Sequence, residues 1–183
     1  MSTQSSTAAT KAIQMVDVVG QYQRYRSEID QAVLEVLGSG KYINGPYVQR
    51  FERAMESYLG VRHAIACASG TDALQLCLMA LDLKPGDEVI TTPFTFAATT
   101  ETIVLLGGVP VYVDIDPATF NIDVEAVEAR ITPRTRAILP VHLFGQPANM
   151  TRLMEIGRKH NLPVIEDAAQ AVGASWEGKK VCG

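Results

Sequence analysis

From Gly60 onward, short apolar runs alternate with helical patterns, and this alternation restricts the possible folds more than any other feature of the sequence. The candidate strands are His63–Ala68, Glu88–Thr92, Pro110–Asp114, Ala137–Val141 and Pro163–Glu166. The helical patterns between them are Thr71–Leu81, Ala97–Leu106, Val124–Ile131 and Met150–His160. Short apolar strands bounded by Gly, Pro or Asp are typical of buried parallel sheets. The pattern therefore predicts an α/β fold with a largely parallel sheet and helices on both faces.

The segment before this alternation, residues 16–60, is predicted to be helical. An amphipathic helix is expected over Tyr22–Leu37, followed by a stop at Gly38-Ser39-Gly40. A second helix is expected to begin near Pro46 and to run to about Leu59. Residues 1–15 begin with a stretch rich in Ser, Thr and Ala, which predicts a disordered leader.

Composition excludes several classes of partner. The 183 residues carry 16 Lys and Arg against 20 Asp and Glu, so the net charge of −4 and the absence of a basic stripe give no reason to expect a nucleic-acid partner. No apolar run is long enough to cross a membrane, and no signal peptide is recognisable. Cys67, Cys77 and Cys182 have no metal-ligand spacing, so no metal site is predicted. Cys67 and Cys77 are expected to be buried reduced thiols, which favours the cytoplasm.

Asp167 is the strongest candidate for a functional residue. It stands at the end of an apolar strand and is followed by small residues, in the run Val164-Ile165-Glu166-Asp167-Ala168-Ala169-Gln170. In open α/β sheets, ligands bind beyond the carboxyl ends of the strands. A carboxylate held there can pair with a protonated pyridine nitrogen. The alternative is that Asp167 caps the next helix or pairs with a nearby Lys or Arg.

Two other strand ends carry groups that could face the same edge of the sheet. Ser69-Gly70-Thr71 joins a predicted strand to a helix, which favours an anion site at the helix N-terminus, although a plain N-cap would explain the same residues. Phe96 could lie against a flat cofactor ring, or it could fill the core as most aromatic residues do. His142 could act in acid–base chemistry, but a hydrogen-bonded structural role is the preferred interpretation.

Three common nucleotide and hydrolase motifs are excluded. Residues 173–180 nearly match a phosphate-binding loop, but Lys180 occupies the position where Ser or Thr must bind magnesium. No G-x-G-x-x-G sequence follows any predicted strand, which disfavours a nicotinamide-binding domain. No G-x-S-x-G elbow of a hydrolase is present either.

Taken together, the strand-end motifs resemble the sugar aminotransferases of the DegT/DnrJ/EryC1/StrS family, which have the pyridoxal-phosphate-dependent transferase fold type I. The resemblance extends from about Val16 to the last residue. The blocks that carry it are Tyr42-Ile43-Asn44-Gly45-Pro46, Ser69-Gly70-Thr71-Asp72-Ala73-Leu74, Gly86-Asp87-Glu88-Val89-Ile90-Thr91, Pro93-Phe94-Thr95-Phe96, Val111-Tyr112-Val113-Asp114-Ile115-Asp116, Ile131-Thr132-Pro133-Arg134-Thr135, Pro140-Val141-His142-Leu143-Phe144-Gly145 and Glu166-Asp167-Ala168-Ala169-Gln170.

The resemblance implies pyridoxal phosphate as the cofactor and assigns roles by position. Gly70 and Thr71 would bind the phosphate, mainly through backbone N–H groups. Phe96 would stack on the pyridine ring. Asp167 would pair with the pyridine nitrogen, and Gln170 would hydrogen-bond the phenolic oxygen. An Asp–pyridinium pair keeps the ring protonated, so that negative charge on the substrate carbon can delocalise into it.

The resemblance also implies an activity and its partners. It implies transamination of a nucleotide-linked keto sugar, with an amino-acid donor that is expected to be glutamate, in the biosynthesis of amino sugars for surface polysaccharide. Tyr42–Pro46 would contact the nucleotide sugar. Similarity there and in Phe94–Thr99 favours a UDP-linked 3-keto sugar, with dTDP- and GDP-linked sugars left open. The family is dimeric, so the full-length enzyme is expected to be a homodimer.

One departure from the family limits these expectations. The family forms its Schiff base through a lysine in a later Ser-Phe…Lys segment, and residues 61–183 read as a cofactor-binding large domain that stops before it. Ser175–Lys180 reads as the start of a hairpin whose return strand is absent. The chain is therefore expected to be the N-terminal portion of a longer polypeptide and to be inactive alone. Alternatives are a dehydratase of the same family, with histidine replacing the lysine, and a non-catalytic truncated or regulatory binding module.

Overall fold

The computed structural model describes residues 15–183, which form two compact units. The first unit ends at Gln49 and the second spans Arg50–Gly183, so the boundary lies within helix α3 (Pro46–Leu59). Apart from Met15, the predicted leader lies outside the described residues.

The first unit contains two helices where the sequence predicts one. They are α1 (Val18–Arg24) and α2 (Arg26–Ser39). The helix predicted over Tyr22–Leu37 is confirmed from Arg26 onward, but its predicted start is wrong. The helix breaks at Tyr25, whose N–H donates to the carbonyl of Tyr22 over 3.1 Å and closes α1. The predicted stop is confirmed, since Gly40 ends α2 with a left-handed φ of 64° that glycine adopts without steric cost.

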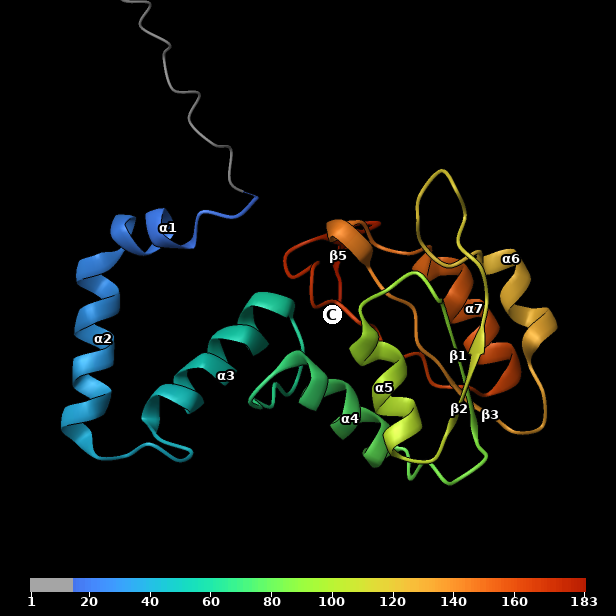
Figure 1. Ribbon diagram of the computed structural model, residues 1–183, viewed down its shortest axis with the longest axis horizontal. Coiled ribbons are helices and arrows are strands. Elements are labelled where there is room, and N and C mark those ends of the chain that lie inside the picture. The colour runs from blue at the N-terminus through green and yellow to red at the C-terminus, as the bar shows by residue number, and fades with distance from the viewer. Residues whose placement is uncertain (1–14) are drawn as a thin grey trace, which may run out of the picture. The chain divides into compact units, whose positions relative to one another are not determined.

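The second unit is built on a parallel sheet, shown in Figure 1. Its strands are β1 (Glu88–Thr91), β2 (Val109–Tyr112) and β3 (Thr135–Ile138), in the order β2-β1-β3. Beyond β3, the segment at 163–167 pairs in parallel through the bridges Ile138–Val164 and Val141–Asp167. This segment is the predicted strand Pro163–Glu166. Its pairing is interrupted, and Pro140 and Pro163 each lack the N–H that a continuous ladder needs.

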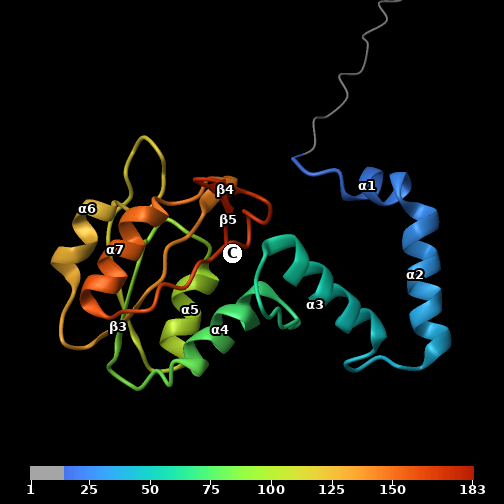
Figure 2. The same ribbon diagram turned by 180° about the vertical axis from the view of Figure 1, so that it is seen from behind.

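Helices cover both faces of this sheet, as the sequence predicts (Figures 1 and 2). They are α4 (Gly70–Ala80), α5 (Ala97–Leu105), α6 (Val124–Val127) and α7 (Met150–His160), with short 3-10 turns at η1 (Glu128–Arg130) and η2 (Leu143–Gly145). Val89 packs with residues of α4 and α5 in one core cluster, whereas its neighbour Ile90 packs with residues of α6 and α7 in the other. Alternate side chains of β1 thus enter opposite cores, as expected for a strand buried on both faces.

The strand predicted over His63–Ala68 is wrong, because these residues have no strand partner in the structure. Side chains of α3 take up their backbone N–H groups instead. Glu52 Oε1 accepts a hydrogen bond from the N–H of Ala66 over 2.9 Å, and Glu56 Oε1 accepts one from Ala64 over 3.3 Å. The segment leads into α4 as a connection without regular secondary structure.

The predicted absence of a return strand at the C-terminal hairpin is also wrong. β4 (Ser175–Trp176) pairs antiparallel with β5 (Lys179–Lys180). Glu177 and Gly178 between them both have positive φ, 47° and 82°, as in the tight two-residue turns that match strand twist. The return strand is therefore present at Lys179–Lys180.

Two further observations concern exposure and membranes. All three cysteines are free and exposed, so the prediction that Cys67 and Cys77 are buried is wrong. Among the helices of residues 15–183, none is long and apolar enough to cross a bilayer.

Candidate active site

A cavity of about 320 Å³ opens at the carboxyl ends of the strands. Its lining comes from the start of α4, the segment leading into α5, the chain after β3, and the turn after Glu166. All five residues predicted to bind the cofactor line it: Gly70, Thr71, Phe96, Asp167 and Gln170. The structure thus brings together residues that lie up to 100 positions apart in the sequence, at the sheet edge where α/β folds bind ligands.

Asp167 is buried in the wall of this cavity, with 8% of its surface exposed. Thr99 Oγ1 donates a hydrogen bond to Oδ2 over 2.8 Å, and the N–H of Ala169 donates to Oδ1 over 3.2 Å. The backbone of Asp167 is fixed as well, because its N–H donates to the carbonyl of Pro140 and its carbonyl accepts from the N–H of His142. The position of the carboxylate is therefore set from both main chain and side chain.

No Lys, Arg or His of residues 15–183 forms an ion pair with Asp167. The alternative that Asp167 pairs with a nearby Lys or Arg is therefore wrong. The other alternative is that Asp167 caps the next helix. Among the described residues, the only backbone N–H that donates to its side chain is that of Ala169, in the following turn. Burying a charged carboxylate is costly unless it is paired. A ligand with a protonated ring nitrogen would supply the positive charge that the described chain does not, so the site fits such a group.

The start of α4 offers backbone donors to the same cavity. Ser69 is the N-cap, since its Oγ accepts a hydrogen bond from the N–H of Asp72 over 3.1 Å. The N–H groups of Gly70 and Thr71 lie in the first turn, where a helix provides no internal acceptors. A Cβ at Gly70 would meet no atom nearer than Ala169 Cβ at 3.9 Å, so the fold itself leaves room for a side chain there. The N-cap and the anion site proposed from the sequence are therefore compatible, since they use different groups.

Phe94 and Phe96 have different environments, although they are two residues apart. Phe94 packs against Phe120 and Phe144, with ring centroids 5.9 and 6.4 Å away. Phe96 is 75% exposed, lines the cavity and makes no ring contact with residues 15–183. The alternative that Phe96 fills the core is wrong, and its exposed ring is free to stack on a planar ligand.

Gln170 presents its amide nitrogen as a donor. Its Oε1 accepts a hydrogen bond from the N–H of Phe144 over 3.0 Å, which fixes the orientation of the amide. No hydrogen bond among the described residues uses its Nε2. This group could donate to a phenolate oxygen, as the resemblance implies.

His142 has the structural role that the sequence analysis preferred. It is fully buried; its Nδ1 accepts from the N–H of Ala148 over 3.1 Å, and its Nε2 donates to Glu166 Oε2 over 2.8 Å. The residue that the sequence analysis missed is Thr99, the donor to Asp167. The only available signal was the spacing of Thr95 and Thr99, four residues apart directly after a strand end.

Comparison with known proteins agrees with this geometry. The model of the DegT/DnrJ/EryC1/StrS aminotransferase family matches residues 23–183. The chain belongs to this family. It is 51% identical over 170 residues to the UDP-2-acetamido-2-deoxy-3-oxo-D-glucuronate aminotransferase of Pseudomonas aeruginosa, covering 93% of this chain and 47% of that protein. It is 42% identical over 177 residues to the dTDP-3-amino-3,4,6-trideoxy-alpha-D-glucose transaminase of Streptomyces venezuelae, covering 97% and 47%.

Solved structures of this family share the fold. DesV of S. venezuelae, in complex with a ketimine intermediate, superposes with a TM-score of 0.92 at 42% identity over 94% of this chain and 46% of that one. The ntda protein of Bacillus subtilis, with bound cofactor PMP, gives a TM-score of 0.84 at 42% identity, over 93% of this chain and 40% of that chain. The predicted fold class, the large domain of the fold type I transferases, is confirmed. The chain spans about half the length of the curated relatives it matches.

Proposed function

We propose that the complete protein is a pyridoxal-phosphate-dependent aminotransferase that transfers an amino group from an amino acid to a nucleotide-linked keto sugar. The observation that carries this proposal is Asp167, a buried carboxylate with no cationic partner in the described chain, in a cavity shared with Gly70, Thr71, Phe96 and Gln170. Relatives named as sugar aminotransferases, at 42 to 51% identity over most of the chain, support it.

Each side of the cavity has a separate task in this proposal. The N–H groups of Gly70 and Thr71 bind the phosphate, favoured by the positive end of the α4 dipole. Phe96 covers one face of the ring and excludes water from it, while Gln170 Nε2 donates to the phenolic oxygen. Asp167 holds a proton on the ring nitrogen through the charge pair. When bound, pyridoxal phosphate supplies the electron sink that amino transfer requires.

The proposed substrate is a sugar nucleotide in amino-sugar biosynthesis for surface polysaccharide, with glutamate as the donor. The turn Tyr42–Pro46 lines a separate cavity of about 510 Å³ within the first unit, which supports its proposed contact with the nucleotide sugar. A UDP-linked 3-keto sugar is favoured by the 51% identity to an aminotransferase named for a UDP-linked 3-oxo sugar. We further propose that the complete enzyme is a cytoplasmic homodimer.

Reconstitution tests this function directly. The complete protein, incubated with pyridoxal phosphate and desalted, is expected to keep one cofactor per chain and a visible absorbance. With glutamate and a UDP-linked 3-keto sugar, mass spectrometry is expected to detect the amino sugar and 2-oxoglutarate. A complete protein that stays colourless and retains no cofactor would overturn the proposal.

A further inference from the structure

Two threonine hydroxyls form a hydrogen-bonded chain that ends on Asp167. Thr95 Oγ1 lies 2.9 Å from Thr99 Oγ1, and Thr99 Oγ1 donates to Asp167 Oδ2 over 2.8 Å. Thr99 has no exposed surface and lies in the first turn of α5. Water therefore has no access to replace this donor in the described structure.

The number of hydrogen atoms on these groups determines which hydroxyl donates in each of the two hydrogen bonds. An ionised carboxylate has only acceptors, and each threonine hydroxyl has one hydrogen. When Asp167 is ionised, Thr99 must give its hydrogen to Asp167, so its oxygen accepts the hydrogen of Thr95. Hydrogen bonds aligned in this way polarise and strengthen one another. The two aligned hydrogen bonds thus stabilise negative charge on Asp167.

A neighbouring threonine shows that this arrangement is not the usual one for a helix. Thr102, also in α5 and also fully buried, bonds back to the carbonyls of Ala98 and Thr99 within its own helix, at 3.0 and 3.4 Å. That is the common pattern for threonine inside a helix. Thr99 instead reaches a carboxylate 68 residues away in the sequence.

We propose that Thr99 is a positioning residue of the cofactor site, supported by Thr95. Its hydroxyl orients the carboxylate of Asp167 and stabilises its charge before the ligand arrives, which no cation of residues 15–183 does. Thr99 does not line the cavity itself and acts through Asp167. This inference rests on the proposed function, because it assigns Thr99 a role in binding pyridoxal phosphate.

The test compares Thr99→Val, Thr99→Ser and Thr102→Val in the complete protein, with the dissociation constant of pyridoxal phosphate as the readout. Thr99→Val keeps the shape and removes the hydroxyl, and we expect affinity to fall by roughly 10- to 100-fold, as for a lost hydrogen bond to a charged group. Thr99→Ser keeps the hydroxyl and should restore most of the affinity. Thr102→Val removes a buried hydroxyl from the same helix and should bind as the wild type does.

Thermal unfolding of the cofactor-free variants separates positioning from general stability. We expect Thr99→Val and Thr102→Val to unfold at similar temperatures, while only Thr99→Val loses cofactor affinity. Wild-type affinity in Thr99→Val, or an equal loss in both valine variants, would overturn the role of Thr99 and leave the proposed function intact. A wild-type complete protein that does not bind pyridoxal phosphate would overturn the proposed function and this inference with it.

Discussion

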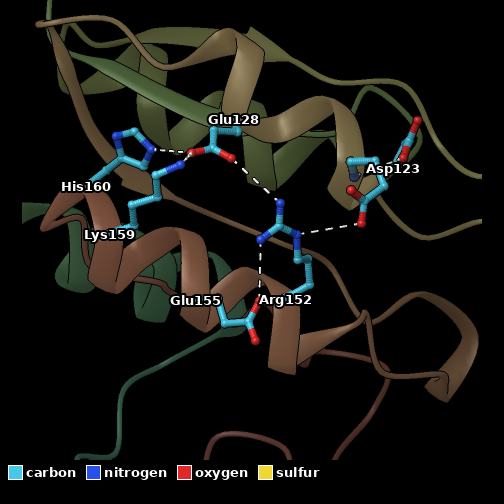
Figure 3. A network of polar contacts seen from close by, with 7 residues as sticks. Asp123, Glu128, Arg152, Glu155, Lys159 and His160 are labelled. Atoms are coloured by element: carbon cyan, nitrogen blue, oxygen red, sulfur yellow. Dashed lines mark hydrogen bonds and ion pairs between the residues drawn. The ribbon is translucent and has the colours of Figure 1, made fainter.

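Glu128 and Asp167 are both fixed by hydrogen bonds, but among the described residues only Glu128 has cations around it. Figure 3 shows Glu128 facing Lys159 and His160 at the end of α7, with Arg152 on its other side. Glu128 Oε1 lies 2.7 Å from His160 Nε2 and 2.5 Å from Lys159 Nζ, and Oε2 lies 3.6 Å from a guanidinium nitrogen of Arg152. The hydrogen bond from His160, followed by that from Lys159, lowers the pKa of Glu128 to about 2.

The difference separates a carboxylate with basic partners in the described chain from one that we propose serves a ligand. The side chain of Glu128 is 28% exposed and still has three basic neighbours. Asp167 is almost completely buried, where an unpaired charge costs more, and its only partners among residues 15–183 are hydroxyl and N–H donors. The described chain therefore surrounds Glu128 with cations and supplies none to Asp167, which supports the proposal that a bound ligand balances the charge of Asp167.

The largest expected effect comes from removing the carboxylate of Asp167 in the complete protein. Asp167→Ala should lower the turnover of transamination by several orders of magnitude, because the ring nitrogen would lose its partner. Glu128→Ala, the matched control, should turn over like the wild type. Steady-state rates of both variants measure this difference. Near-wild-type turnover of Asp167→Ala would show that Asp167 has only a structural role.

Gly70→Ala should have opposite effects on folding and on binding. The fold leaves room for the Cβ, so the cofactor-free protein should be more stable by about 0.5–1 kcal/mol, as for alanine replacing glycine in a helix. The same methyl group would crowd the proposed phosphate position and lower cofactor affinity by about tenfold, the scale of one lost hydrogen bond to a charged group. Chemical denaturation and cofactor titration measure the two effects; unchanged affinity would argue against a phosphate beside Gly70.

Phe96→Ala and Phe94→Ala extend the comparison to the aromatic residues. Phe96 has no ring partner in the described chain, so its loss should cost about 0.5 kcal/mol of stability or less and weaken cofactor binding by about 0.5–1.5 kcal/mol, roughly 2- to 12-fold. Phe94→Ala should mainly destabilise the fold, since its ring packs on two others. Equal effects of both variants on cofactor affinity would contradict the distinction between them.

The smallest expected effect concerns pH and Glu128. Its pKa falls from 4.5 to about 2 on folding, so it stabilises the fold above about pH 4.5, and that contribution is lost as the pH falls toward 2. Glu128→Gln should lower stability at neutral pH slightly and flatten its decline on acidification. Urea unfolding at a series of pH values measures this. A variant whose pH profile overlays the wild type would show that the surrounding cations contribute no net stability.

Much of the fold could be predicted because its signals are local. The bounds of α7 match the prediction, since Asn149 caps its start and Asn161 ends it with a left-handed φ of 53°. The strand predicted at 63–68 failed because an apolar run does not reveal its partner, and here side chains of α3 occupy the backbone donors. Strand pairing depends on contacts between distant segments, which the local sequence does not specify.

The same distinction applies to the site. Phe96, Asp167 and Gln170 could be placed together because each follows a predicted strand that pairs in the structure, and strand ends meet at one edge of a parallel sheet. Gly70 and Thr71 also line the cavity, although the strand predicted before them is absent. The contact of Thr99 with Asp167 could not be predicted, since a threonine in a helix most often bonds to its own helix. Nor could the sequence show that Asp167 has no cationic partner among residues 15–183, because that depends on every side chain packed around it.

The most direct test of the central claim is the protonation state of the cofactor nitrogen in the complete protein. Pyridoxal phosphate labelled with nitrogen-15 in the ring can be bound to the wild type and to Asp167→Asn and compared by NMR. We expect a protonated ring nitrogen in the wild type at neutral pH and an unprotonated one in the variant. An unprotonated ring nitrogen in the wild type, or the same chemical shift in both proteins, would contradict the assignment of Asp167 as its partner.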